Sequence, residues 1–122
     1  MELANLDFQQ ARIKQVLFKS RLRSVLYGVR EADAALFSLR ENPLGEWLHT
    51  IVKPKYGSFG EVRQLEQLVQ QMLEAGAQLV QQYQRGQIEE ARAALSRIDS
   101  FADQIEATLH ALEQKVAASQ QA

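Results

Sequence analysis

Apolar residues recur along this chain three and four positions apart, which is the spacing of amphipathic helices. The first run predicts a helix over about residues 7–27, with a stop at Gly28, because glycine commonly ends helices. Ile13 and Leu17 widen the apolar stripe of this helix, so we expect it to be buried on more than one side. The stripe itself consists of Phe8, Ala11, Val16, Phe18, Leu22, Val25 and Leu26.

The segment NPLGEWL, residues 42–48, is the one place where proline, glycine and the single tryptophan occur together. Asn42 is predicted to cap a helix, and Pro43 suits the first helical position because the amide hydrogen that it lacks would have no partner there. Gly45 is predicted to let a neighbouring backbone come close, with Trp47 packing beside it. Apolar residues Leu44, Trp47, Leu48 and Ile51 fall on one face of this helix.

Breaks and caps delimit the neighbouring elements. A second short helix is expected over residues 32–39, and Pro54 is predicted to end the helix that starts at NPLGEWL. Ser58 and Glu61 have the spacing of a capping box, which predicts the start of a long helix that ends near Gly86. The apolar stripe of that long helix is Val62, Leu65, Leu68, Val69, Met72, Leu73, Leu79, Val80 and Tyr83.

A last helix is predicted from about residue 88 to about 116, with residues 115–122 expected to fray. Three long amphipathic helices and a broken middle segment predict an all-α fold. The predicted architecture is an antiparallel four-helix bundle, with a short broken helical segment between the first and the third long helix. Neither a strand pattern nor a linker divides the chain, so residues 1–122 are expected to form a single domain.

Composition fits this interpretation. A chain of 122 residues with 46% apolar residues suits one globular domain. Its net charge of −1 gives no reason to expect a nucleic acid or an anionic membrane as partner. Residues 1–60 carry nine Lys and Arg against six Asp and Glu, whereas residues 61–122 carry five against nine. We expect the basic face of the first helix to pair with the acidic last helix.

The chain contains no cysteine, which excludes disulfides, thiolate nucleophiles and cysteine-based zinc sites. Met1 suggests a natural start, and no apolar run resembling a signal peptide follows it. No stretch approaches the roughly 20 apolar residues of a membrane-spanning helix. The sequence therefore predicts a cytoplasmic protein that does not cross a membrane.

Candidate chemistry is sparse. The two histidines, His49 and His110, have Glu46 and Glu106 one helical turn before them. Such pairs occur in di-iron bundles, but those sites need four carboxylates that converge on the core, and here the carboxylates lie at polar positions. No serine has an evident histidine partner, and no glycine-rich phosphate loop is present. We therefore expect no enzyme, no metal and no cofactor.

Three stretches resemble a known family. They are RIKQVLFKSRL in the first helix, NPLGEWL with the KYG that follows it, and EVRQLEQLVQQML at the start of the long helix that ends near Gly86. Together they are similar to the chemoreceptor zinc-binding (CZB) domain, a bacterial four-helix bundle, over about residues 8–112. The most specific part is Leu44-Gly45-x-Trp47, in the spacing that the family has from Phe18 and Lys19.

The resemblance also implies where the family's zinc ligands would lie, three histidines and one cysteine. The matching positions here are Gln15, Asn42, Val69 and Leu73, so all four ligands are absent. The resemblance thus implies a degenerate member that has lost zinc binding. Gln15 and Asn42 remain candidates for contact with a ligand or a partner, or for hydrogen bonds to each other or to nearby backbone. Phe18, Leu44, Gly45 and Trp47 form the structural motif.

The functional expectation is a non-enzymatic bacterial signalling or regulatory module, related to chemotaxis, that acts through protein–protein contacts. The resemblance implies a homodimer, with a signalling partner that the sequence does not identify. Two alternatives stay open: a structural homo-oligomerisation bundle, and a binder of a small polar ligand at the former metal site.

Overall fold

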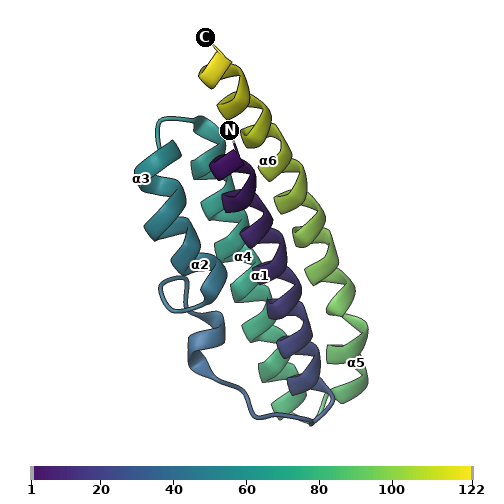
Figure 1. Ribbon diagram of the computed structural model, residues 1–122. Coiled ribbons are helices and arrows are strands. Elements are labelled where there is room, and N and C mark those ends of the chain that lie inside the picture. Colours follow the sequence, from purple (N-terminus) through teal and green to yellow (C-terminus); the bar gives the residue numbers. More distant parts are fainter. Residues whose placement is uncertain (1, 122) are drawn as a thin grey trace.

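A computed structural model describes residues 2–121, with side chains placed for residues 6–119. Every regular element in that range is helical, so the predicted all-α class is confirmed. The long helices α1 (Glu2–Leu26), α4 (Gly60–Gln84) and α6 (Leu95–Gln121) run alongside one another, and the start of α1 and the end of α6 lie at the same end of the fold (Figure 1). Helix α6 continues through most of the tail that was expected to fray.

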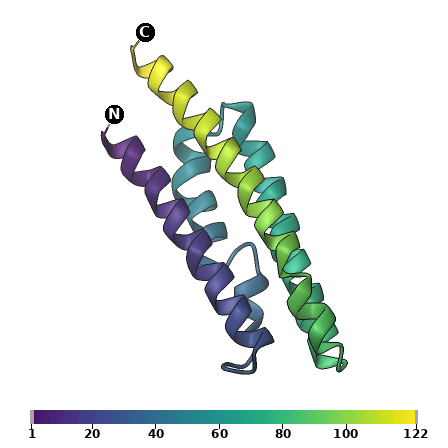
Figure 2. The ribbon, with the colours of Figure 1, turned by 90° about the vertical axis from the view of Figure 1, so that its right-hand side faces the viewer.

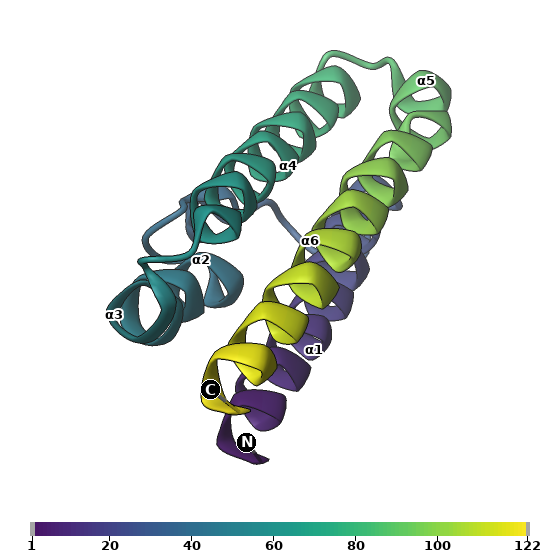
Figure 3. The same cartoon turned by 90° about the horizontal axis from the view of Figure 1, so that it is seen from above.

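The fourth column of the fold is short and broken. A 3₁₀ turn, η1 (Ala34–Phe37), leads into α2 (Pro43–Trp47), a π-helical turn η2 (Leu48–Val52) and α3 (Lys53–Tyr56). Seen along the axis, this column lies beside α4, while α6 lies beside α1 (Figure 3). Helices α1 and α4 run one way, and α2–α3 and α6 run the other way (Figures 1 and 2). The arrangement is consistent with the antiparallel four-helix bundle that the sequence predicts.

The two predicted glycine stops are confirmed. Gly28 has a φ of 74° and Gly86 a φ of 90°, a region that residues with a Cβ rarely adopt. After each glycine, the next residue donates its backbone N–H to the carbonyl five residues earlier, at 2.8 and 3.0 Å. This is the Schellman pattern of helix termination, and it turns the chain at the lower end of the fold in Figure 1.

The predicted last helix is divided in two. Helix α5 (Ile88–Ala93) ends in a turn at Ala94, and α6 begins directly after it. Arg92 of α5 donates its Nε–H to the carbonyl of Leu26 at 2.8 Å and lies over the Tyr27 ring, 4.3 Å from its centre. A cation at the C-terminus of a helix interacts favourably with the helix dipole, so Arg92 fastens α5 to the end of α1.

Two predicted boundaries are wrong. Pro54 does not end its helix: Lys53 bonds to the carbonyl of Leu48, five residues earlier, and the chain remains helical to Tyr56. The π turn changes the hydrogen-bond register directly before Pro54, whose ring would clash with a carbonyl in a regular α-helix. Ser58 does not cap α4 either, because Phe59 occupies the cap position and makes no side-chain cap bond.

The predicted helix over residues 32–39 is also much shorter, namely the single turn η1. Asp33 caps this turn by accepting a hydrogen bond from the amide of Ala35 at 3.0 Å. The remaining residues of the segment are irregular, because the chain has to cross from the end of α1 to the start of α2. The core lies between the four columns, and its largest fully buried side chains include Phe8, Phe18, Leu22, Leu44, Leu48, Leu65, Met72, Leu73, Leu79, Ile98 and Ile105.

Candidate functional site

The NPLGEWL segment has the local structure that its sequence predicts. Asn42 is 1% exposed and caps α2: its Oδ1 accepts from the amide of Leu44 at 2.9 Å. Its Nδ2 donates to the carbonyl of Leu36 at 2.6 Å, which ties η1 to the start of α2. Both ends of the Asn42 amide are therefore engaged within the chain.

Gly45 permits a close approach between backbones, as predicted. A Cβ at this position would lie 1.8 Å from the carbonyl oxygen of Leu39. Trp47, two residues further along α2, meets the ring of Phe8 edge to face, with 6.4 Å between the ring centres. Tyr56 stacks on the same Phe8 at 5.4 Å and donates its hydroxyl to Asp7 at 3.1 Å. The segment thus joins η1, α1 and α3 into one packed unit.

The other positions that match the family's ligands lie on α1 and α4. Val69 and Leu73 are buried in the hydrophobic core on α4. Gln15 lies on α1, and its Nε2 atom is buried without a hydrogen-bond partner in the described part of the chain. No hydrogen bond joins Gln15 to Asn42 there. No three His, Asp or Glu side chains lie close enough to hold a metal ion within the described residues, and both histidines are exposed.

Gln15 borders a groove of about 350 Å³ between α1 and α6. Arg12 crosses this groove and bonds to Glu106 at 2.7 Å and to Glu113 at 2.6 Å, while Lys19 pairs with Asp99. The expected pairing of the basic first helix with the acidic last helix is thereby confirmed for Arg12 and Lys19. The groove is lined by Arg12, Gln15, Val16, Lys19, Met72, Ile98, Asp99, Ala102, Asp103 and Glu106.

The outer face of α1 is apolar and exposed, contrary to the sequence prediction. Ile13 is 61% exposed, Val16 69% and Leu17 42%, although Val16 was placed in the core stripe and the other two on a second buried side. Leu6, at 55%, extends the same face. Helix α1 turns Phe8 and its neighbours toward the bundle, and no described element covers the opposite side.

We define the α1 face as seven exposed residues: Leu6, Gln9, Gln10, Ile13, Val16, Leu17 and Ser20. None of them is charged. Their spacing of three and four residues places them on one side of the helix and repeats every seven residues, as in a coiled-coil seam. The seven-residue spacing from Leu6 through Ile13 to Ser20, free of charge, was the signal in the sequence that could have identified this face.

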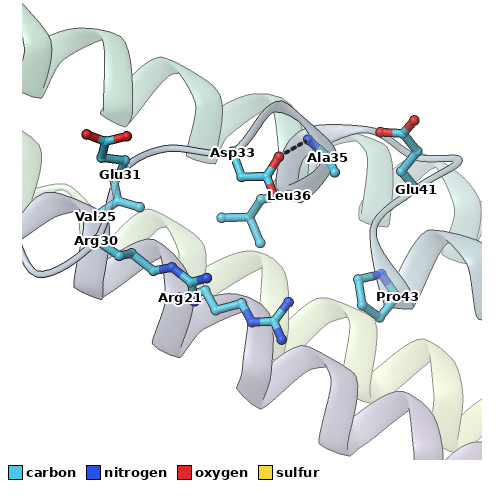
Figure 4. Close-up of a pocket in the computed structure, with 9 residues that line it drawn as sticks. All are labelled: Arg21, Val25, Arg30, Glu31, Asp33, Ala35, Leu36, Glu41 and Pro43. Atoms are coloured by element: carbon cyan, nitrogen blue, oxygen red, sulfur yellow. Dashed lines mark hydrogen bonds between the residues drawn. The ribbon is translucent and has the colours of Figure 1, made fainter.

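A second hollow, of about 150 Å³, lies between α1 and residues 27–42, the crossing segment that leads from α1 to α2 (Figure 4). Arg21 and Arg30 extend beneath Leu36, and neither makes an ion pair within the described residues. Glu31, Asp33 and Glu41 also line the hollow, and Asp33 is engaged as the cap of η1. Three carboxylates beside two guanidinium groups give the hollow mixed charge and no clear preference for an anion.

Comparison of the chain with protein-family models, with curated proteins and with solved structures finds no match. Among the described helices, none combines the length and the apolar character needed to cross a membrane. The function is therefore inferred from the surface of the chain itself.

Proposed function

We propose that this chain is a non-enzymatic, cytoplasmic interaction module of a signalling or regulatory system. It acts by packing the α1 face against a helix of another protein chain. The observation that carries this proposal is the exposure of Leu6, Ile13, Val16 and Leu17 side by side on one helix. Single exposed apolar residues are ordinary on a soluble protein, but a contiguous apolar patch marks an interaction site.

The shape and the chemistry of the face favour a helix as its occupant. Apolar side chains that repeat every seven residues along a straight helix pack against a second helix by inserting knobs into holes. The polar members of the α1 face, Gln9, Gln10 and Ser20, are uncharged, so burying them costs less than burying an ion. A signalling role is suggested by the sequence resemblance to the chemoreceptor zinc-binding domain and remains a prediction.

The alternative of a small polar ligand held by Gln15 and Asn42 gains no support. The Asn42 amide is already bonded at both ends, and no hydrogen bond links it to Gln15. The alternative of a homo-oligomerisation bundle shares the α1 face with our proposal, and it differs in requiring no further partner.

The test is site-specific photo-crosslinking in the cells that produce the protein. A photoreactive residue replaces Leu17 on the α1 face, and a control variant carries it at Gln67, which is exposed on α4. We expect a product of defined mass from position 17 and none from position 67. Adding Ile13→Glu should abolish that product while the helical circular dichroism stays unchanged. Products of equal yield from both positions, or from neither, would refute the proposal.

A further inference from the structure

We infer that the helix bound by the α1 face is α1 of a second copy of this chain, packed parallel and in register. In this pair, Lys14 and Arg21 of each copy reach the acidic groove between α1 and α6 of the other. The inference rests on the proposed use of the α1 face and names its partner.

The two edges of the α1 face differ in charge. Lys14 and Arg21 lie along one edge, seven residues apart, and neither makes an ion pair within the described residues. Asp7 lies on the same edge, but Lys55 and Tyr56 hold its carboxylate. This edge therefore presents two cations that make no ion pair, and Arg21 also borders the hollow that contains Glu31 and Glu41.

The groove between α1 and α6 forms the other edge, and Val16 belongs both to the groove and to the α1 face. Two cations, Arg12 and Lys19, face four carboxylates in and beside the groove, which leaves it negative. Asp103 makes no ion pair within the described residues. The carboxylates are Asp99, Asp103, Glu106 and Glu113.

These opposite edges determine the orientation of the pair. When two identical helices pack in parallel about a two-fold axis, each edge meets the opposite edge of the other copy. The basic edge then lies against the acidic groove, once on each side of the axis. In an antiparallel pair, each edge would instead meet the same edge of the other copy. Lys14 and Arg21 would then face Lys14 and Arg21 of the second copy, and like charges at an interface are unfavourable. In the parallel pair, Arg21 of the second copy crosses Val16 and approaches Asp103.

The orientation can be read with introduced cysteines, because the chain has none of its own. Ser20 lies on the α1 face, so parallel packing in register brings the two Ser20 positions opposite each other. Cysteines introduced there would be near enough for a disulfide. We expect Ser20→Cys to form a covalent dimer on mild oxidation, and Ser20→Cys mixed with Gln10→Cys to form few mixed products. The reverse result would overturn the parallel register: a disulfide between the cysteines at positions 10 and 20 of two copies, without one between the two cysteines at position 20.

Charge exchange tests the groove. Light scattering and sedimentation of the full chain are expected to show a dimer. The substitution Arg21→Glu should raise the dissociation constant of this dimer by about tenfold. Adding Asp103→Arg to the same chain should restore the affinity, because the two substitutions recreate the pair between copies. Arg63→Glu, the same charge change at an exposed position on α4, is the matched control and should leave the affinity unchanged. No rescue by Asp103→Arg would contradict the proposed contact.

The inference and the proposed function fail in different ways. A folded monomer at high concentration, together with a cellular crosslink from position 17 to a different protein, would overturn the second copy as partner and leave the α1 face as an interaction site. A dimer that Leu17→Glu does not weaken would show that association uses another surface, and it would overturn the inference.

Discussion

Replacing Gly45 by alanine tests the close packing of α2 against the backbone of Leu39, which lies between η1 and α2. The added Cβ would lie 1.8 Å from the carbonyl oxygen of Leu39, 2.6 Å from its carbonyl carbon and 3.0 Å from its Cα. All three atoms belong to the backbone, so no side chain can rotate away. The contact with the oxygen is more than 1 Å closer than packed atoms allow, and either α2 or the crossing segment has to move.

Several interactions oppose that movement. Asn42 ties η1 to α2 through Leu36, and Trp47 and Leu44 of α2 are buried in the core. Overpacking a core costs about 1–3 kcal/mol and occasionally more, and a clash with immovable backbone belongs at the upper end. Alanine gains back about 0.5–1 kcal/mol of helix propensity over glycine. We therefore expect Gly45→Ala to lower the free energy of unfolding by about 2–3 kcal/mol.

The assay is urea denaturation followed by circular dichroism, with Gly60→Ala as the matched control. Gly60 is the first residue of α4, and a Cβ there would meet no atom within 4 Å. The control should therefore be as stable as the unsubstituted chain or slightly more stable. A Gly45→Ala variant with the stability of the Gly60→Ala variant would refute the reasoning, because Leu39 and Gly45 could not then be in backbone contact.

Three further predictions concern the cap at Asn42, the hydroxyl of Tyr56 and the binding of zinc. Asn42→Ala should lower the free energy of unfolding by about 1–3 kcal/mol, because it removes the α2 cap and leaves the carbonyl of Leu36 without its donor; equal denaturation midpoints would contradict this. Burial, and then the bond to Asp7, raises the pKa of Tyr56 to about 12, so the neutral form is favoured in the folded state. The stability that this provides should be complete below pH 10 and decline by roughly 2–3 kcal/mol as the pH rises through 12; Tyr56→Phe should abolish that part of the decline in pH-dependent denaturation. Titration with zinc in a calorimeter should give no binding heat, since no three potential ligands meet within the described residues, and a stoichiometric heat would show a site formed in another way.

Features that depend on neighbouring residues could be read from the sequence. Asn42 as cap, Gly45 at a close approach, and Gly28 and Gly86 as helix ends were all predicted correctly. Each follows from what one residue type can do with its own backbone: accept a bond from an amide, omit a Cβ, or adopt a positive φ. The family resemblance, with its candidate site at Gln15 and Asn42, remains a prediction.

Features that depend on distant packing could not be read in this way. Pro54 and Ser58 carry strong local signals, yet a π turn bypasses the first and Phe59 takes the cap position from the second. Whether Val16 is buried depends on the rotation of α1 about its axis, which the other helices set. Glu61, expected to reach back to Ser58, instead pairs with Lys115 of α6, a partner that sequence spacing does not reveal.

The π turn η2 sets the directions in which Trp47 and Tyr56 point about the axis of the broken helix α2–α3. In a regular α-helix, at about 100° per residue, Trp47 and Tyr56 would point to opposite sides of the axis, about 180° apart. The one additional residue that a π turn accommodates reduces that angle to about 80°. Both rings can then pack on Phe8, one edge-on and one stacked. Deleting one exposed residue of this turn, such as Thr50, would leave eight residue steps between the two rings, which is again about 80° in a regular α-helix. The π turn thus absorbs one residue and keeps both aromatic contacts in step.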